Sequence, residues 1–188
     1  MNVFDTIIAV FWLIFLGCWL ISAPGAKRNR QGIAWSREAA LRVAIVIAVI
    51  LLLKSPLRQY VTDASNPISN PVVESIGVAL CAIGIAFAIW ARLSLGRNWG
   101  FPMTLKADPE LVSNGPYALV RHPIYAGILL AVVGTALVIG PVWLLVVVIV
   151  CAYFLYAAAQ EERLLTEAFP LEYPAYKRRT KMLIPFII

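Results

Sequence analysis

The 188-residue chain is 61% hydrophobic and only 14% charged, with a mean hydropathy of +0.82. An ordinary soluble domain is about 25% charged, and a chain of this length could not bury so much apolar surface in a soluble core. The formal net charge of +6 does not indicate nucleic acid, because the basic residues lie beside apolar runs, where membrane topology and anionic lipid explain them. We therefore expect an integral membrane protein.

The N-terminal half contains three apolar runs that are long enough to cross a bilayer. The first run, residues 3–21, is followed rather than preceded by positive charge, which favours a retained span over a cleaved signal peptide. The second run covers residues 38–53 and the third covers residues 72–95. The third contains Gly77 and Gly84, small residues that let helices approach closely in lipid.

The C-terminal half begins with the longest polar interruption, residues 96–121, whose length in so small a bundle indicates a functional loop. Two further apolar runs, residues 124–139 and 142–159, are separated only by a Gly-Pro pair and predict a tight antiparallel helical hairpin. The last helix should leave the membrane as an amphipathic segment that ends at Pro170. We predict one all-α membrane domain, residues 1–188, with about five transmembrane helices.

Charge distribution predicts the orientation of these spans. An N-terminus outside the cell places residues 27–37, 92–121 and 160–188 on one side, and these segments hold most of the lysines and arginines. The positive-inside rule makes that side cytoplasmic. The cysteines, at positions 18, 81 and 151, all lie inside apolar runs, so we expect neither a disulfide nor a metal site.

The single histidine, His122, lies in a distinctive cluster over residues 115–127. Pro123 suits a first helical turn, and the preceding loop can present free backbone N–H groups to an anionic or zwitterionic ligand. Tyr117 and Tyr125 offer aromatic faces to a purine or a sulfonium cation. The alternative interpretation is an interfacial anchor, since aromatic and basic residues gather where helices meet headgroups.

Two adjacent carboxylates, Glu161 and Glu162, close the last apolar run. Ionised carboxylates at membrane depth are costly unless they are paired or hydrated. They are either part of a site or simply mark the membrane boundary. The predicted hairpin returns them to the membrane face that holds Arg121 and His122, so residues distant in sequence should lie close together.

These patterns together resemble a known family. The residues that carry the resemblance are Leu111 to Tyr117, Arg121 to Gly127, Glu161 and Glu162, extended by Phe169, Tyr173, Tyr176, Lys177 and Ile184 to Phe186. They resemble the isoprenylcysteine carboxyl methyltransferases and the related phospholipid methyltransferases. The resemblance covers roughly the C-terminal half, so we divide the domain into three N-terminal spans, residues 1–93, and a methyltransferase-like region, residues 94–188.

The resemblance implies an S-adenosylmethionine pocket on the cytoplasmic side and no metal. The implied cofactor-binding residues are Pro109, Glu110, Leu111, Val112, Tyr117, His122, Pro123, Ile124, Tyr125 and Glu161. Arg121 and Glu162 are the implied catalytic candidates, which would position the acceptor or shape the field at the transition state. The chain departs from the prenylcysteine enzymes at Ala157 and Ala158, where those enzymes place an arginine.

The expected function is therefore methyl transfer from S-adenosylmethionine to a lipid-like, isoprenoid or prenylated acceptor at the cytoplasmic membrane interface. One alternative is an NADPH-dependent membrane reductase of the sterol-reductase type, whose C-terminal region resembles this family. The other is a non-enzymatic membrane scaffold. The expected partners are the lipid bilayer and the lipophilic acceptor, and no feature of the sequence indicates an obligate protein partner.

Overall fold

The computed structural model describes residues 3–22, 29–32, 70–99, 104–106, 109–140 and 142–185, together with residues 40, 41, 43–45, 47 and 51. The predicted second span, residues 38–53, lies largely outside the described residues, although those of its residues that are described are helical.

Helices dominate the described residues. The α-helices are α1 (Val3–Ser22), α4 (Pro71–Leu95), α5 (Pro123–Ile139), α6 (Val142–Ala168) and α7 (Glu172–Arg179), and the 3₁₀ turns are η2 (Gly96–Asn98) and η3 (Gly115–Ala118). Helices α1, α4 and α6 are long and apolar enough to cross a membrane, whereas the apolar helix α5 is shorter. The protein is a multi-pass helical membrane protein, as the composition predicts.

A short antiparallel ribbon was not expected from the sequence. Strand β1 (Asn29–Gly32) pairs with β2 (Thr104–Lys106), so the segment after α1 meets the long polar interruption. The hydropathy pattern contains no signal for such short polar strands, because their pairing partner is distant in the chain.

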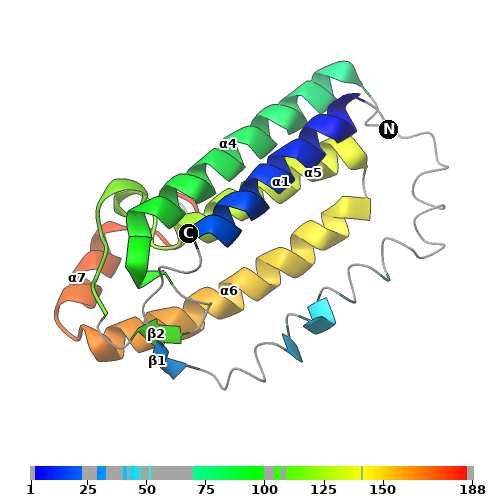
Figure 1. Cartoon of the computed structure of the whole chain (residues 1–188). Coiled ribbons are helices and arrows are strands. Elements are labelled where there is room, and N and C mark those ends of the chain that lie inside the picture. The colour runs from blue at the N-terminus through cyan, green and yellow to red at the C-terminus, as the bar shows by residue number, and fades with distance from the viewer. Residues whose placement is uncertain are drawn as a thin grey trace.

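The long helices are aligned along one axis (Figure 1). Helices α1, α4 and α6 run in one direction, and α5 runs in the opposite direction. The ends of α4 and α6 therefore meet the start of α5 at one end of the bundle, where α7 also lies (Figure 1). The chain between α1 and α4 joins opposite ends of the bundle, and the predicted second span lies within that connection.

Helices α4 and α5 pack through glycines, with their backbones in direct contact. A Cβ atom built on Gly84 would lie 2.5 Å from the carbonyl oxygen of Gly127, and one on Gly77 would lie 2.7 Å from that of Gly134. These separations are too short for any side chain. Seven-residue spacing on both helices repeats the contact two turns along, so the glycines set the interhelical distance.

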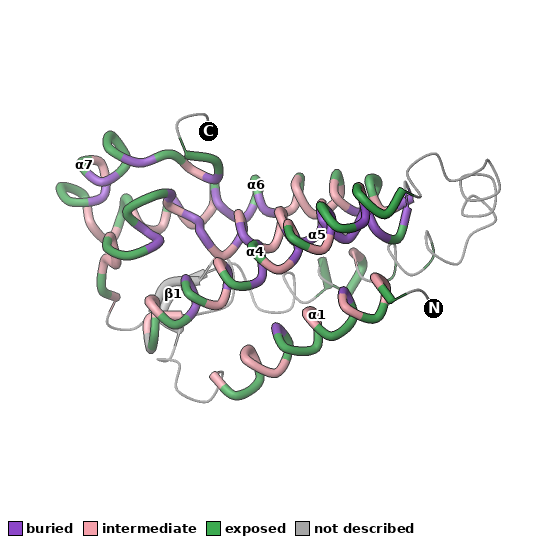
Figure 2. The backbone as a smooth tube through the Cα atoms, turned by 90° about the horizontal axis from the view of Figure 1, so that it is seen from above, coloured by how far each residue is buried: buried purple, intermediate pink, exposed green. Residues whose placement is uncertain are grey.

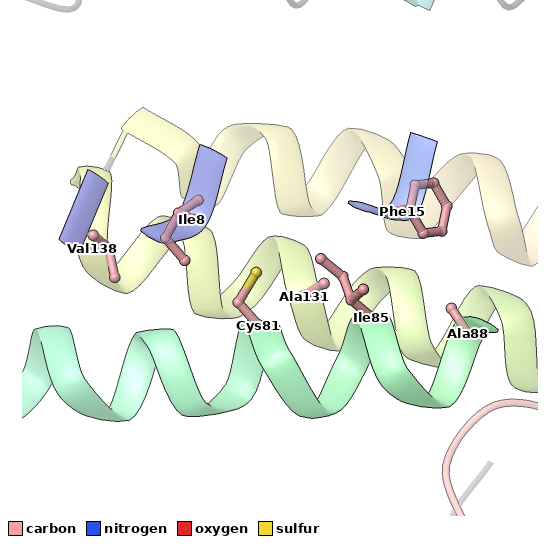
Figure 3. Packing of buried hydrophobic residues seen from close by; sticks show 7 residues of the cluster. All are labelled: Ile8, Phe15, Cys81, Ile85, Ala88, Ala131 and Val138. Atoms are coloured by element: carbon pink, nitrogen blue, oxygen red, sulfur yellow. The ribbon is translucent and has the colours of Figure 1, made fainter. Parts of the chain in front are cut away.

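Helix α1 covers the α4–α5 pair through a buried apolar cluster. Figure 3 shows the cluster, which contains Ile8, Phe15, Cys81, Ile85, Ala88, Ala131 and Val138. Polar contacts of Thr135 accompany this cluster. The indole nitrogen of Trp12 donates to Thr135 Oγ1 at 3.0 Å. The hydroxyl of Thr135 donates in turn to the carbonyl of Ala131.

The predicted hairpin is confirmed, with α5 ending at Ile139 and α6 beginning at Val142. Gly140 adopts a positive φ of 124°, which favours glycine over residues with a side chain. Its N–H donates to the Ala136 carbonyl and caps α5. Helix α6 continues without a break to Ala168, as predicted from the absence of a helix breaker before Pro170. Helices α6 and α1 both carry exposed large apolar residues, and exposed positions recur along the length of both helices (Figure 2).

Candidate functional site

The candidate site lies at the end of the bundle where α5 begins. His122 immediately precedes α5, and Pro123 occupies the first turn, where a missing N–H costs no helical hydrogen bond. The backbone here pairs with the segment after α7, since the N–H of Arg121 donates to the Lys181 carbonyl at 2.8 Å and that of His122 to the Met182 carbonyl at 3.0 Å. The C-terminal segment therefore holds the histidine loop in place.

Glu162 is the centre of a buried charge cluster. Its Oε1 accepts from Nε of Arg121 at 2.7 Å, and its Oε2 lies 2.5 Å from Nζ of Lys177. The guanidinium of Arg121 also donates to the Thr180 carbonyl. Glu162 is only 5% exposed, and removing a buried ion from such a cluster is costly. The cluster ties the α5 start, α6 and α7 together.

Glu161 faces a different set of partners, because successive residues of a helix project about 100° apart. Its Oε1 accepts a 2.5 Å hydrogen bond from the Tyr125 hydroxyl, and its Oε2 lies 3.3 Å from Nδ1 of His122. The rings of His122 and Tyr125 stack with centroids 5.5 Å apart. Tyr125 stacks on Phe154 at 4.4 Å, so α5 and α6 share one aromatic column.

The two glutamates control the charge of His122. Burial by itself lowers the pKa of a histidine, but attraction to the carboxylates of Glu161 and Glu162 outweighs it, and the pKa of His122 is raised. Its Nε2 is buried and lies 3.7 Å from Glu162 Oε1, beyond hydrogen-bond distance. The cationic form of His122 therefore has a spare donor.

Three buried tyrosines surround this charge cluster. The Tyr176 hydroxyl donates to the Tyr117 carbonyl at 2.6 Å, which joins α7 to η3. Burial raises the pKa of Tyr176 to about 12 and raises those of Tyr117 and Tyr173 further, so all three remain neutral phenols. Tyr173 is 1% exposed, and its hydroxyl has no partner among the described residues.

A cavity of about 410 Å³ opens beside these residues. Every predicted cofactor residue borders it: Pro109, Glu110, Leu111, Val112, Tyr117, His122, Pro123, Ile124, Tyr125 and Glu161. Arg121 borders it as well, whereas Glu162 is not among the described lining residues and lies in the charge cluster. The fold thus brings three separate parts of the sequence to one cavity, and the roles of these residues remain a prediction.

The cavity has further lining residues that were not among the predicted cofactor-binding or catalytic residues. They are Trp19, Leu95, Asn98, Trp99, Ile128, Tyr153, Phe154, Leu164, Leu165, Tyr173 and Tyr176. Asn98 and Trp99 lie in the polar interruption, whose length was a signal for function. Trp19 had no such signal, because only tertiary packing brings the end of α1 to this cavity.

Arg92 organises the wall nearest α1. Its guanidinium lies 4.4 Å from the centre of the Trp99 ring and donates to the carbonyls of Ser22 and Gly96. Trp19 and Trp99 meet edge to face at 6.5 Å. A buried cation at the end of α4 thus caps α1 and positions both indoles.

The part of the chain that forms most of this site matches a known protein family. The family model described as phospholipid methyltransferase matches residues 73–172, more than half of the chain. The chain belongs to the phospholipid methyltransferase family. The residues matched by this family run from the start of α4 to the start of α7, so they include the helices whose ends border the cavity.

Individual proteins that are similar to this chain carry varied names. The chain is 36% identical over 127 residues to the protein-S-isoprenylcysteine O-methyltransferase of Saccharomyces cerevisiae, covering 65% of this chain and 53% of that protein. It is 26% identical to the methanethiol S-methyltransferase of a Pseudomonas species, covering 77% and 57%. It is 30% identical to the nickel-cobalt-cadmium resistance protein NccN of Alcaligenes xylosoxydans xylosoxydans, covering 58% and 52%. The chain thus spans little more than half the length of these relatives.

Proposed function

We propose that this protein transfers a methyl group from S-adenosylmethionine to an amphiphilic acceptor at the cytoplasmic face of the membrane. The observation that carries the proposal is the meeting of Pro109 to Val112, the His122 loop and Glu161 around one cavity. The volume of the cavity lies in the range of small-ligand sites. Its position at the end of the bundle suits a water-soluble donor and a membrane-borne acceptor.

Unpaired polar atoms support a polar ligand in the cavity. Among the described residues, buried side-chain atoms without a hydrogen-bond partner include His122 Nε2, Asn98 Oδ1 and the Tyr173 hydroxyl, all on residues that border the cavity. Buried polar groups are costly when left unpaired. A ligand with both donors and acceptors, such as S-adenosylmethionine, would satisfy them.

The electrostatic character of the cavity fits a cationic donor. S-adenosylmethionine, when bound, supplies a methyl carbon activated by a sulfonium, which becomes a neutral thioether when the acceptor takes the methyl group. The carboxylate of Glu161 and the ring of Tyr125 would stabilise a nearby cation. Their positions are held by the Tyr125 hydroxyl bond to Glu161 and by stacking on Phe154.

The chain's own residues would contribute orientation and exclusion of water, which are sufficient for in-line methyl transfer without a covalent enzyme intermediate. Ile128, Tyr153 and Leu164 form part of an apolar wall suited to the lipophilic portion of an acceptor. Arg121 would face the acceptor, with Glu162 holding its guanidinium in position. The exposed basic residues at the end of α7 would attract anionic headgroups.

A thermal-shift experiment on the purified protein in detergent tests the choice of cofactor. Saturating S-adenosylhomocysteine should raise the melting temperature, because a ligand that binds only the folded state stabilises it. A concentration of 100 times Kd corresponds to about 2.7 kcal/mol. Saturating NADPH should leave the melting temperature unchanged. Stabilisation by NADPH alone would favour the reductase instead.

Incubation with methyl-labelled S-adenosylmethionine and membrane extract then tests the acceptor class. Label should appear in an organic-soluble product that requires the intact protein. The acceptor panel should include lipids, isoprenoid thiols, carboxylates and amines, because the relatives carry names that refer to different acceptors. A protein that binds S-adenosylhomocysteine but labels only water-soluble molecules would contradict an amphiphilic acceptor.

A further inference from the structure

Tyr173 combines deep burial with an unused hydroxyl group. The residue lies on the second position of α7, is 1% exposed and borders the cavity. Its hydroxyl has no hydrogen-bond partner among the described residues. A buried phenol normally finds a partner, because an unpaired hydroxyl loses its hydration without compensation.

Tyr176, one helical turn later, provides an internal comparison. It is also buried and borders the same cavity, but its hydroxyl donates to the Tyr117 carbonyl at 2.6 Å. The hydroxyl of Tyr176 therefore has a structural role within the protein. The same role is not available to the hydroxyl of Tyr173.

The surroundings of Tyr173 indicate which part of a ligand it would meet. Arg121, His122 and Glu161 border the same cavity as Tyr173, and the rest of the wall includes apolar and aromatic residues such as Ile128 and Phe154. Both oxygens of Glu162 are already engaged by cations. A zwitterionic amino-acid group fits the charged end, with its ammonium toward Glu161 and its carboxylate toward the donors.

We propose that the Tyr173 hydroxyl, together with Nε2 of His122, donates a hydrogen bond to the carboxylate of the methyl donor's amino-acid portion. This inference rests on the proposed function, because it requires S-adenosylmethionine as the ligand. It adds a ligand-binding residue on α7, which the sequence resemblance did not assign to the cofactor. Burial raises the pKa of Tyr173, so the phenol keeps its proton and remains a donor.

The test compares two ligands and two tyrosine variants of the full-length protein in detergent. S-adenosylhomocysteine has the amino-acid portion, and 5′-methylthioadenosine retains the nucleoside thioether but lacks it. Tyr173→Phe should bind S-adenosylhomocysteine about ten- to hundred-fold more weakly than wild type, the usual effect of losing a hydrogen bond to a charged group. Its affinity for 5′-methylthioadenosine should match that of wild type.

The ligand-free melting temperature provides the structural control. Tyr173→Phe should melt like wild type, because its hydroxyl makes no bond within the described protein. Tyr176→Phe should melt a few degrees lower, because it loses the bond to Tyr117, and should change the affinities for the two ligands by the same factor.

Three outcomes would overturn the inference. They are an unchanged S-adenosylhomocysteine affinity in Tyr173→Phe, an equal loss for both ligands, or a fall in its ligand-free melting temperature matching that of Tyr176→Phe. A wild-type protein that binds neither ligand would instead reject the proposed function itself. The wild-type measurement therefore distinguishes failure of this inference from failure of the proposed function.

Discussion

At the scale of single residues, the adjacent glutamates have separate environments. Glu161 borders the cavity and contacts Tyr125 and His122. Glu162 lies away from the described cavity wall, where Arg121 and Lys177 neutralise it. One carboxylate thus borders the cavity, and its neighbour holds the surrounding elements together.

Because the two environments differ, substitution of each glutamate by glutamine should affect a different property of the protein. Glu162→Gln should lower the free energy of unfolding by about 3 kcal/mol, because it leaves the buried guanidinium of Arg121 without its anion. Glu161→Gln should leave the fold stable and weaken the binding of S-adenosylhomocysteine. Denaturation curves and binding isotherms of both variants check the prediction. Equal loss of stability in the two variants would contradict the separation of roles.

His122 predicts a specific dependence of stability on pH. Its pKa is raised above the ordinary value of 6.5 by Glu161 and Glu162 in the folded protein. The resulting stabilisation is fully present below about pH 6.5 and is lost as the pH rises through the raised folded-state pKa. His122→Gln cannot titrate, so the stability advantage of wild type over this variant should shrink with rising pH.

Melting temperatures of both proteins from pH 5.5 to pH 9 measure this effect, and other titrating groups cancel in the difference. The groups that face His122 are Glu161, Glu162 and the Tyr125 ring. Parallel curves for wild type and variant would show that the histidine does not titrate with folding.

At the scale of elements, helix α5 serves both the site and the bundle. Its first turns present Tyr125 to the cavity, and Gly127, only two residues later, contacts Gly84 of α4. The glycine of the His-Pro-x-Tyr-x-Gly arrangement is thus a packing residue. The position of the histidine loop depends on how closely α4 and α5 approach.

Gly84→Ala should therefore destabilise the protein by about 1–3 kcal/mol, the usual cost of overpacking. Its new Cβ would meet backbone atoms of Gly127 and Ala131 at 2.5 Å, and backbone cannot move aside as a side chain can. Gly17→Ala is the matched control, because a Cβ there has nothing within 4 Å. Melting temperatures should fall for the first variant only. Wild-type stability of Gly84→Ala would show that the two helices can separate without cost.

At the scale of the whole molecule, the helix directions place the cavity and the C-terminal segment at the same end of the bundle (Figure 1). The contact of Arg121 with Glu162 requires this arrangement. The assignment of that end to the cytoplasm comes from the positive-inside rule and remains a prediction.

Cysteine labelling with a membrane-impermeant maleimide tests the orientation. Single cysteines at Arg178, exposed on α7, and at Asn70, exposed before α4, mark opposite ends of the bundle in a background without the native cysteines. In intact cells Asn70→Cys should react and Arg178→Cys should not. Opening the cells should expose Arg178→Cys. The reverse pattern would place the site outside.

The sequence by itself was sufficient for the membrane class and the C-terminal hairpin, and its resemblance to a known family pointed to half of the described residues that line the cavity. Long apolar runs can satisfy their backbone only as helices in lipid, so hydropathy alone predicts them. The short link at Gly140 forces α5 and α6 to be adjacent, which returns Glu161 to the face that holds His122. Sequence patterns therefore predicted the features that depend on residues close together in the chain.

Only the tertiary structure determined the features that depend on contacts between segments distant in the chain. No periodicity distinguishes Glu161 from Glu162, because which one faces the cavity depends on how α6 is rotated against α5 and α7. Tyr173 and Trp19 reach the cavity only because α7 and α1 pack at that end of the bundle. Side-chain environment is a property of neighbours in space, so composition and spacing along the chain could not supply it.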